Sequence, residues 1–410
     1  MEAGVSLKEL QSARWRRDPY AYYAQLHERG TAAARLDPVR DHYDVIVYGY
    51  EAADRVLKDP SFQLMDSDYM DGAVPHWRDH TVLRVLKDSV FFVNGAVHTR
   101  MRHLFNQAFT PRRVTALEPA VMRITDELLD RMAELSTEGA AVDFMAEFAF
   151  PLPSNVIGEL LGVPEQDRAW FRPLVRALSE IFELDGSTWA NMRAADAATG
   201  QLRDYFAELA AKRRVDPQDD LVSALVAARV EGSAQLTDDE LLANLIALFN
   251  AGFVTTTHMF GCGLALLLAR PAALAALRAD PELAASYVEE ILRYEPPTHF
   301  LIRYATEDTE VDGVPVPRGS SVVVALGAAN RDPQRFADPA VFDPLRSDNR
   351  PLSFGAGPHF CLGAALTRVE GQLAFPRLLQ RFPGLALAGD PGVPTKLMFR
   401  GYEKLAVTCR

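Results

Sequence analysis

The pattern of apolar and polar residues predicts a mainly helical protein. Apolar positions recur at helical spacing from about Pro19 to Arg270. Residues 45–48 and 321–325 are short runs rich in β-branched side chains, and residues 312–319 contain turn residues. These segments predict two strands and a small hairpin. We therefore expect a mainly α fold with small β-sheets (α+β).

The chain contains no internal repeat, low-complexity tract or long linker, so we predict a single domain over residues 1–410. The helix-rich core is expected at about 80–295 and 350–385. The β-rich parts are expected at about 40–60, 298–326 and 385–410.

The longest predicted helix begins at a capping box, Thr237 to Glu240, and ends before Arg270-Pro271. At 1.5 Å per residue it would span roughly 45 to 50 Å. Between Leu241 and Ala269 there is no charged residue apart from the titratable His258. Asparagines and threonines interrupt this apolar run, and no basic flank accompanies it. We interpret the segment as a buried central helix rather than a membrane span.

The middle of this helix has little side-chain bulk at Ala251-Gly252, and three threonines follow it. A glycine inside a helix costs about 1 kcal/mol relative to alanine, so a packing or binding role is expected to compensate. Two interpretations are open at this point. The glycine permits either a tight crossing by another helix or a groove in which a flat ligand or small molecule lies against the helix.

Composition and charge exclude several classes of protein. The 410 residues are 48% hydrophobic and 24% charged, which is typical of packed globular proteins and not of disordered or coiled-coil chains. The formal net charge of −12 disfavours nucleic acid as a partner. Three cysteines without a C-x-x-C pair indicate neither a disulfide framework nor a zinc finger. Since the first ten residues lack a signal-peptide pattern, we expect a cytoplasmic protein with no membrane attachment.

The segment that carries chemistry is Ser353-Phe-Gly-Ala-Gly-Pro-His-Phe-Cys361-Leu-Gly. Gly355 and Gly357 permit tight turns, and Cys361 precedes a predicted helix over residues 362–379. A thiol at a helix N-terminus is stabilised as the thiolate, which a metal ligand or a nucleophile requires.

Several interpretations of this segment fail or stay weak. A dinucleotide-binding loop is excluded because Phe360 occupies the third glycine position, and zinc lacks further ligands at usable spacing. A cysteine nucleophile with His359 as base is possible but weak, because residues two apart seldom face each other. An inert buried cysteine in a glycine-rich turn stays open on this segment alone.

The run Phe354-Gly-x-Gly-x-His359-x-Cys361-Leu-Gly363 resembles, position by position, the haem-binding loop of the cytochrome P450 family. The resemblance extends from about Pro19 to the C-terminus and implies the cytochrome P450 fold, with a long central helix over haem b. Cys361 would then be the iron ligand. The resemblance implies that the haem is held by Phe354, Gly355, His359 and Gly363 in the loop, and by Arg303, His98 and Arg102 elsewhere.

Glu290 and Arg293 resemble the E-x-x-R pair of the family, and Arg346 resembles the arginine that completes its structural network. Alone, a Glu and an Arg three residues apart would be an ordinary surface ion pair worth about 0.2 to 0.5 kcal/mol. The resemblance implies that all three residues hold the fold and take no part in catalysis.

The run Ala251-Gly252-Phe253-Val254-Thr255-Thr256 resembles the oxygen-activation motif of the family. The resemblance implies that Thr255 guides protons during oxygen activation, with Thr256, Gly252 and Ala251 beside it. Val254 departs from the family pattern, which has an acid there, and a valine cannot shuttle protons. Delivery would use water, Thr256 or a substrate group. We expect His258 to be packed rather than to act as proton donor.

The resemblance implies a monooxygenase of the soluble bacterial type that uses O2 and electrons from a ferredoxin and its reductase. We expect it to hydroxylate a mid-sized organic molecule, free or tethered to a carrier protein, in secondary metabolism such as antibiotic biosynthesis, and to act as a monomer. Arg100, Arg112, Arg113 and Arg368 are candidates for a redox-partner patch. Residues mapped as substrate contacts are Asn250, Phe253, Val254, His299, Phe300, Leu301 and Phe399, with Met398, Phe182 and the loop at about 63–93, which holds His76, Trp77 and His80.

Two other functions stay open. The missing acid at Val254 suits an atypical oxidation that couples, cyclises or desaturates its substrate without inserting oxygen. A protein of another class would bind haem without turnover, as a sensor or a recruiting module.

Overall fold

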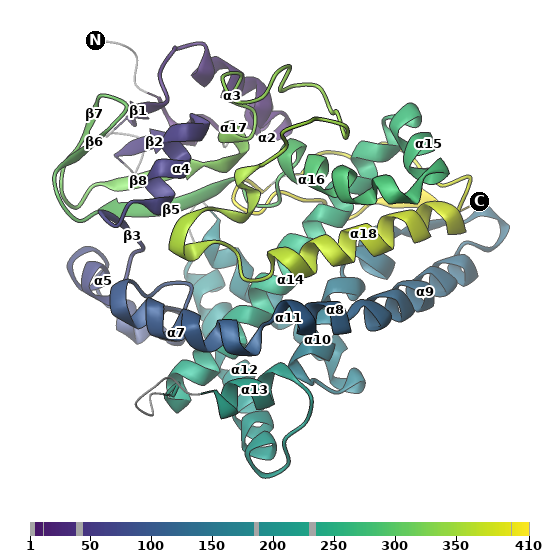
Figure 1. Ribbon diagram of the computed structural model, residues 1–410, viewed down its shortest axis with the longest axis horizontal. Coiled ribbons are helices and arrows are strands. Elements are labelled where there is room, and N and C mark those ends of the chain that lie inside the picture. The colour runs from purple at the N-terminus through teal and green to yellow at the C-terminus, as the bar shows by residue number, and fades with distance from the viewer. Residues whose placement is uncertain are drawn as a thin grey trace. The chain divides into compact units, whose positions relative to one another are not determined.

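The structure is a computed structural model that describes residues 5–10, 12–37, 44–183, 188–228, 235–394 and 396–409 (Figure 1). The prediction made from the first ten residues therefore lies partly outside the described ones. Contacts along the chain divide it into two compact units. The first unit comprises residues 1–63, 126–149 and 255–410, and the second comprises 64–125 and 150–254. The single domain over 1–410 stays a prediction.

The first unit holds the sheets. Its largest sheet has five strands in the order β1 (Ala33–Arg35), β2 (Val45–Val47), β8 (Ser321–Ala325), β5 (Phe300–Ala305) and β3 (Phe62–Gln63). Only β2 and β8 pair in parallel, with Ile46 opposite Val323. The interior strand β8 is a run of valines because it is buried throughout. Helix α4 (Tyr50–Lys58) packs its apolar face on these strands, as Figure 1 shows.

Two smaller sheets complete the first unit. Strands β6 (Thr309–Val311) and β7 (Val314–Val316) form the predicted hairpin, with Asp312-Gly313 at its turn. Strands β4 (Ala141–Asp143), β10 (Ala406–Thr408) and β9 (Ala386–Leu387) form the other. The helices of the first unit, besides α4, are α1 (Leu7–Leu10), α2 (Ala13–Arg17), α3 (Pro19–His27), α15 (Pro271–Ala279), α16 (Ala284–Tyr294), α17 (Leu326–Ala329) and α18 (Ala364–Arg381).

The second unit is helical among its described residues. It contains α5 (Ser67–Ala73), α6 (Thr81–Lys87), α7 (Gly95–Ala108), α8 (Pro111–Ala116), α10 (Pro151–Leu161), α11 (Glu165–Ser179), α12 (Trp189–Val215) and α13 (Leu221–Ala227). Helices α9 (Glu118–Leu135) and α14 (Asp238–Leu268) contribute residues to both units.

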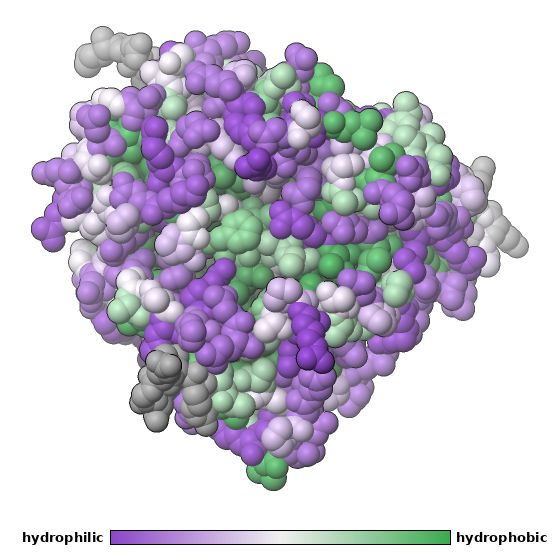
Figure 2. Space-filling model, viewed as in Figure 1, coloured by the Kyte–Doolittle hydropathy of each residue, from purple (hydrophilic) through white to green (hydrophobic). Residues whose placement is uncertain are grey.

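The fold class is confirmed as mainly α with small sheets, and two of the regions expected to be β-rich contain only short strands. The region at about 40–60 contains α4 after its strand, because Ala52, Ala53, Val56 and Leu57 recur at helical spacing and are buried together. Between 385 and 410, only β9 and β10 are strands among the described residues. Figure 2 shows hydrophilic residues over most of the face that Figure 1 presents.

Helix α14 is the predicted central helix, and its start follows the sequence closely. The Thr237 hydroxyl accepts the amide of Glu240, and the Glu240 carboxylate accepts the amide of Thr237. The helix is long and apolar enough to cross a membrane, but 78% of its most apolar window is buried inside the structure. It is therefore a core helix, as predicted.

Candidate active site

The Cys361 loop, residues 353–363, contains two short 3-10 turns and leads into helix α18. The backbone amide of Cys361 donates to the carbonyl of Phe354 at 2.9 Å, and the amide of Phe360 donates to the carbonyl of Gly357 at 3.0 Å. These bonds close the loop on itself. Cys361 is partly exposed and forms no disulfide, so the interpretation as an inert buried cysteine is wrong.

Two glycines are required by the shape of this loop. Gly355 and Gly357 have φ of +69° and +68°, a region that side chains disfavour. At Gly357 a Cβ atom would also lie 2.5 Å from the carbonyl oxygen of Leu57, at the end of α4. The motif therefore contains glycine because the loop turns tightly against α4.

Helix α18 starts at Ala364 with Gly363 as its N-cap, two residues later than predicted. Leu362 and Gly363 form a turn, and the first capping bond is from the amide of Thr367 to the carbonyl of Gly363 at 2.9 Å. Cys361 thus lies just ahead of the first helical turn. The macrodipole still favours its thiolate, although less than at a position inside the cap.

Arg303 provides a buried positive charge in β5 of the same unit. It is 4% exposed, and burial lowers the pKa of its guanidinium to about 10. Its Nη1 donates to the carbonyl of Ile302, and no carboxylate among the described residues pairs with it. Its neighbour in β5, Leu301, lies close to Gly355, whose Cβ position would be 3.7 Å from the leucine side chain. A buried guanidinium without a carboxylate fits a ligand that brings its own anionic groups.

Four residues in the middle of α14 are partly exposed, although most of their neighbours in the helix are buried. They are Ala251, Gly252, Val254 and Thr255. Thr256 is buried, and its hydroxyl lies 3.3 Å from that of Thr367 in α18. Thr255 is thus the threonine of the pair that can meet a bound molecule, while Thr256 contacts the helix that follows Cys361.

The small residue Gly252 is explained by a helix crossing within the second unit. A Cβ atom there would lie 3.1 Å from Ile157 of α10. Phe253 is buried and stacks on Phe150 at 6.1 Å between ring centroids. Asn250 accepts a hydrogen bond from Ser179 of α11 at 3.1 Å. The tight crossing is therefore confirmed, and it leaves one side of Gly252 partly exposed.

His258 is packed away, as predicted. Its ring lies against Gly401 so closely that a Cβ atom there would overlap Nδ1. Burial first, and the nearby charge of Lys396 second, lower its pKa to about 4. The imidazole is therefore neutral near pH 7 and has no proton to spare as an acid.

His98 and Arg102 lie one turn apart in α7 of the second unit. His98 is buried, and its pKa is lowered by burial and by the charge of Arg102. Their spacing of four residues within α7 puts both positions on one face of the helix, as predicted.

Glu290 and Arg293 form a completely buried ion pair in α16, not a surface pair. Two contacts of 2.7 Å join the guanidinium to the carboxylate, and both side chains are 0% exposed. Arg293 also donates to the carbonyls of Asn330, Pro339 and Val341. Arg346 lies 3.8 Å from Glu290, so the structure brings the three predicted residues together.

The mapped substrate contacts differ in exposure. His299 and Phe300 are fully buried, and His299 Nδ1 lies 2.9 Å from the hydroxyl of Tyr23, so these two residues hold β5 against α3. Leu301 and Phe399 are partly exposed. His299 and Phe300 are therefore buried at the start of β5, and their role as substrate contacts stays a prediction.

The arginines of the predicted redox-partner patch, which stays a prediction, mostly form ion pairs inside the units. Arg100 binds the carboxylate of Glu240, Arg113 lies 3.3 Å from Asp219, and Arg368 binds Glu289. Only Arg112 of the four has no ion pair among the described residues, and it is exposed. Three of the four charges are thus already matched within the protein.

The sequence analysis missed Lys87, in the loop region mapped to the substrate. It is 7% exposed, its ammonium donates to the carbonyl of Met65, and it lies 4.7 Å from the centroid of the Phe92 ring. Burial lowers its pKa to about 8. The sequence signal that could have found it is its place directly after the apolar residues Val85 and Leu86. In a helix this position lies next to the buried side.

Comparison with known proteins gives consistent matches. The family model for Cytochrome P450 matches residues 6–396. The 6-deoxyerythronolide B hydroxylase of Saccharopolyspora erythraea is 37% identical over 415 residues, covering 98% of this chain and 99% of that protein. The structure of P450BioI, in complex with an acyl carrier protein ligated to hexadec-9Z-enoic acid, has a TM-score of 0.89 at 34% identity and covers 97% and 99% of the two chains. CxnD, described as an enzyme for C–S bond formation in chuangxinmycin biosynthesis, has a TM-score of 0.85 at 34% identity, with 99% and 97% covered.

Proposed function

This chain belongs to the cytochrome P450 family, whose members bind haem b, and we propose that it hydroxylates a mid-sized organic molecule of bacterial secondary metabolism with O2. The observation that carries the proposal is the constrained, partly exposed Cys361 in the same unit as the buried guanidinium of Arg303.

The residues present fit the cofactor. Cys361 would ligate the iron, and Arg303 would bind a propionate, together with His359 and with His98 and Arg102 of α7. Phe354, Gly355 and Gly363 shape the loop around the thiolate. Bound in this way, haem with a thiolate ligand supplies the redox chemistry that cleaves the O–O bond.

The protein's own part in the reaction is to position the substrate and to deliver protons. Thr255 offers a hydroxyl on the partly exposed side of α14, beside Ala251 and Gly252. Val254 offers no proton, and His258 is neutral and packed against Gly401. Protons therefore reach Thr255 through water or a substrate group, with Thr256 held by Thr367.

The substrate site that we propose includes Asn250, Phe253, Val254, Leu301 and Phe399. Four of these residues are apolar and Asn250 is polar, which suits a mid-sized organic molecule. Asn250 is already held by Ser179, so its amide is fixed in place rather than free to turn. We infer that the substrate is free or tethered to a carrier protein, as in the P450BioI complex.

Electrons are proposed to come from a ferredoxin and its reductase, and the enzyme is proposed to act as a cytoplasmic monomer. Arg112 is the candidate docking charge, because it is the exposed member of the four arginines without an ion pair in the described parts of the chain.

A second candidate reaction is an oxidation that couples, cyclises or desaturates without inserting oxygen. Val254 favours it, because slower proton delivery suits reactions that do not rebound a hydroxyl group. CxnD, which forms a C–S bond, has a similar structure. A protein that binds haem without turnover is the remaining alternative, and NADPH consumption with product formation distinguishes it from an enzyme.

The proposal is tested first by the reduced protein with CO. Thiolate ligation gives a red-shifted Soret band, and Cys361→Ala removes it, with Cys409→Ala as the matched control that keeps it. A band that survives in Cys361→Ala overturns the ligand assignment.

The substrate class is then found by a Soret titration of the haem protein with polyketides, terpenes, aromatic acids and cyclic dipeptides. A low-to-high-spin shift with one of them supports a free substrate. If none shifts the band, a carrier-tethered compound is titrated next, and failure of that shift as well contradicts the proposed oxidation.

A further inference from the structure

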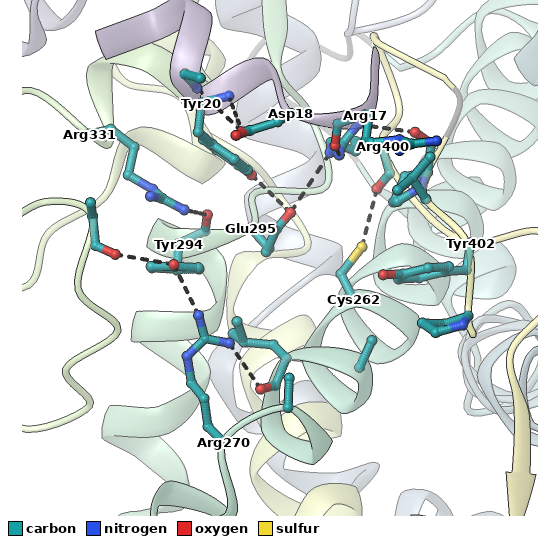
Figure 3. Close-up of a pocket in the computed structure, with 18 of the residues that line it drawn as sticks. Arg17, Asp18, Tyr20, Cys262, Arg270, Tyr294, Glu295, Arg331, Arg400 and Tyr402 are labelled. Atoms are coloured by element: carbon teal, nitrogen blue, oxygen red, sulfur yellow. Dashed lines mark hydrogen bonds and ion pairs between the residues drawn. The ribbon is translucent and has the colours of Figure 1, made fainter. Parts of the chain in front are cut away.

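A cavity lies entirely within the first unit, and none of its lining residues belongs to the proposed active site. Its volume is about 620 Å³, within the range of small-molecule sites. Its walls come from α2 and α3, the last turns of α14, the end of α16, and residues 391–402 near the C-terminus. Figure 3 shows Glu295 near its centre, with Tyr20, Arg331 and Arg400 around it.

Arg331 is the most unusual group in this cavity. It is 92% buried, and its guanidinium lies between two aromatic rings, 4.0 Å from the centroid of Tyr20 and 3.7 Å from that of Tyr294. Its Nη2 donates to the carbonyl of Tyr294 at 2.7 Å. Its Nε has no hydrogen-bond partner among the described residues. This Nε has almost no accessible surface, so an occupant of the cavity does not reach it. The terminal nitrogen Nη1 donates to no acceptor among the described residues and keeps accessible surface, so it is the N–H to which a ligand can bind.

Arg400 adds a second buried positive charge on the other side of the cavity, although its terminal nitrogens are already paired. It is 4% exposed and donates to the carbonyls of Arg16, Arg17 and Pro394. Its Nε lies 3.9 Å from the carboxylate of Glu295, which is beyond hydrogen-bond distance, and it too has no acceptor in the described chain. Glu295 instead accepts a hydrogen bond of 2.9 Å from the hydroxyl of Tyr20.

The charges of the cavity do not balance. Four arginines line it, Arg17, Arg270, Arg331 and Arg400, against two carboxylates, Asp18 and Glu295. Asp18 is occupied as the N-cap of α3, where it accepts the amides of Tyr20 and Ala21. Arg270 donates to the carbonyl of Leu266 and the hydroxyl of Tyr294, so it has no carboxylate partner either. The cavity therefore favours an anion.

The rest of the wall is apolar. Ala21, Ala24, Ala265, Leu266, Leu387 and Val393 line it, and the alanines leave the space open because their side chains are short. An inorganic anion would leave this apolar surface in contact with water. An anion with a hydrocarbon body covers it and gains the free energy of apolar burial.

We propose that this cavity binds a small organic carboxylate, with its anionic group at Arg331 and its hydrocarbon body against the alanines of α3 and α14. The site is separate from substrate oxidation, so its occupant is neither the substrate nor the cofactor. The carboxylate provides an acceptor for Arg331 Nη1, and the two tyrosine rings hold the guanidinium plane for it.

The test uses the haem-loaded protein saturated with 4-phenylimidazole, which ligates the iron and blocks the active site. Octanoate is titrated by calorimetry, and the Soret band is followed to show that the imidazole stays bound. We expect saturable binding at one site, at least tenfold tighter than that of 1-octanol. No heat of binding with octanoate, or equal affinity for octanol, overturns the proposal.

Variants then locate the site. Arg331→Gln is expected to weaken octanoate binding at least tenfold, while Arg350→Gln, at an exposed arginine, leaves it unchanged. Should Arg331→Gln not fold, Ala21→Trp fills the cavity from an exposed position of α3 and is expected to abolish binding with the melting temperature kept. If octanoate binds the Ala21→Trp variant as tightly as it binds the parent protein, its site is not this cavity and the proposal is wrong.

Discussion

At the scale of single residues, the role proposed for Thr255 predicts how electrons are divided between product and peroxide. We expect Thr255→Ala to lower the product formed per NADPH several-fold and to raise the peroxide released, because the hydroxyl that guides protons is lost. Thr255→Ser keeps the hydroxyl and is expected to keep most of the coupling. Product, NADPH and peroxide are measured together during turnover with the identified substrate. Unchanged coupling in Thr255→Ala would assign proton delivery to another group.

Val254 makes a separate prediction, because it is a partly exposed apolar residue where the family has an acid. Val254→Asp is expected to raise the fraction of oxygen-inserted product, since an acid beside Thr255 adds a proton route. Val254→Asn is the matched polar control without an ionisable proton and is expected to behave like the parent. The products are separated by chromatography and identified by mass. A product ratio that does not change in Val254→Asp shows that proton supply does not limit the reaction.

At the scale of helices and strands, the buried pair of α16 carries a prediction of stability. Removing one partner of a buried ion pair costs about 3 to 5 kcal/mol, because the other charge is left without compensation. We therefore expect Glu290→Gln to lower the free energy of unfolding by about that amount and to lower haem retention. The backbone amide of Asp343 and the side-chain amide of Asn349 donate to the two oxygens of Glu290, and glutamine keeps only one of these acceptors.

The control for this prediction is an exposed pair. Arg350 lies 3.1 Å from Asp348, with side chains 83% and 55% exposed, and Arg350→Gln is expected to change stability by less than about 1 kcal/mol. Urea unfolding of the haem-loaded protein measures both variants. If both variants lose a similarly small free energy of unfolding, the Glu290 ion-pair network does not stabilise the fold as proposed.

Local signals in the sequence were sufficient for several elements. The capping box at Thr237 and the turn at Asp312-Gly313 act over a few residues, and the structure has both. The glycines of the Cys361 loop were recognisable as a motif, but the reason for Gly357 is a distant residue, Leu57. The start of α18 was misplaced because Leu362 fits a helical pattern, although Gly363 is the cap that begins it.

At the scale of the whole molecule, sequence reasoning does not supply the contacts that join distant segments. Arg100 binds Glu240, which is 140 residues away. His299 contacts Tyr23 from the start of the chain, and its assignment to the substrate stays a prediction. Neither contact can be recognised from the spacing of apolar and polar residues in the sequence. The cavity around Arg331 has the same origin, since its residues come from both ends of the chain.

The acid stability of the whole molecule depends on His258. Its pKa is about 4 when folded and about 6.5 when unfolded, so the unfolded chain binds the proton first as the pH falls. The stabilisation is complete above pH 6.5 and is lost progressively toward pH 4. From pH 7 to pH 5 this one group is expected to remove about 2 kcal/mol from the free energy of unfolding.

This loss is measured by urea unfolding of the haem-loaded protein between pH 7 and pH 5. His258→Gln removes the titrating ring, so its stability is expected to fall less steeply over this interval, even where its stability at pH 7 is lower than that of the parent. His76→Gln, at an exposed histidine, is expected to keep the slope of the parent. If His258→Gln also keeps that slope, the buried ring does not set the acid limit, and carboxylates that lose their charge in the folded protein must set it instead.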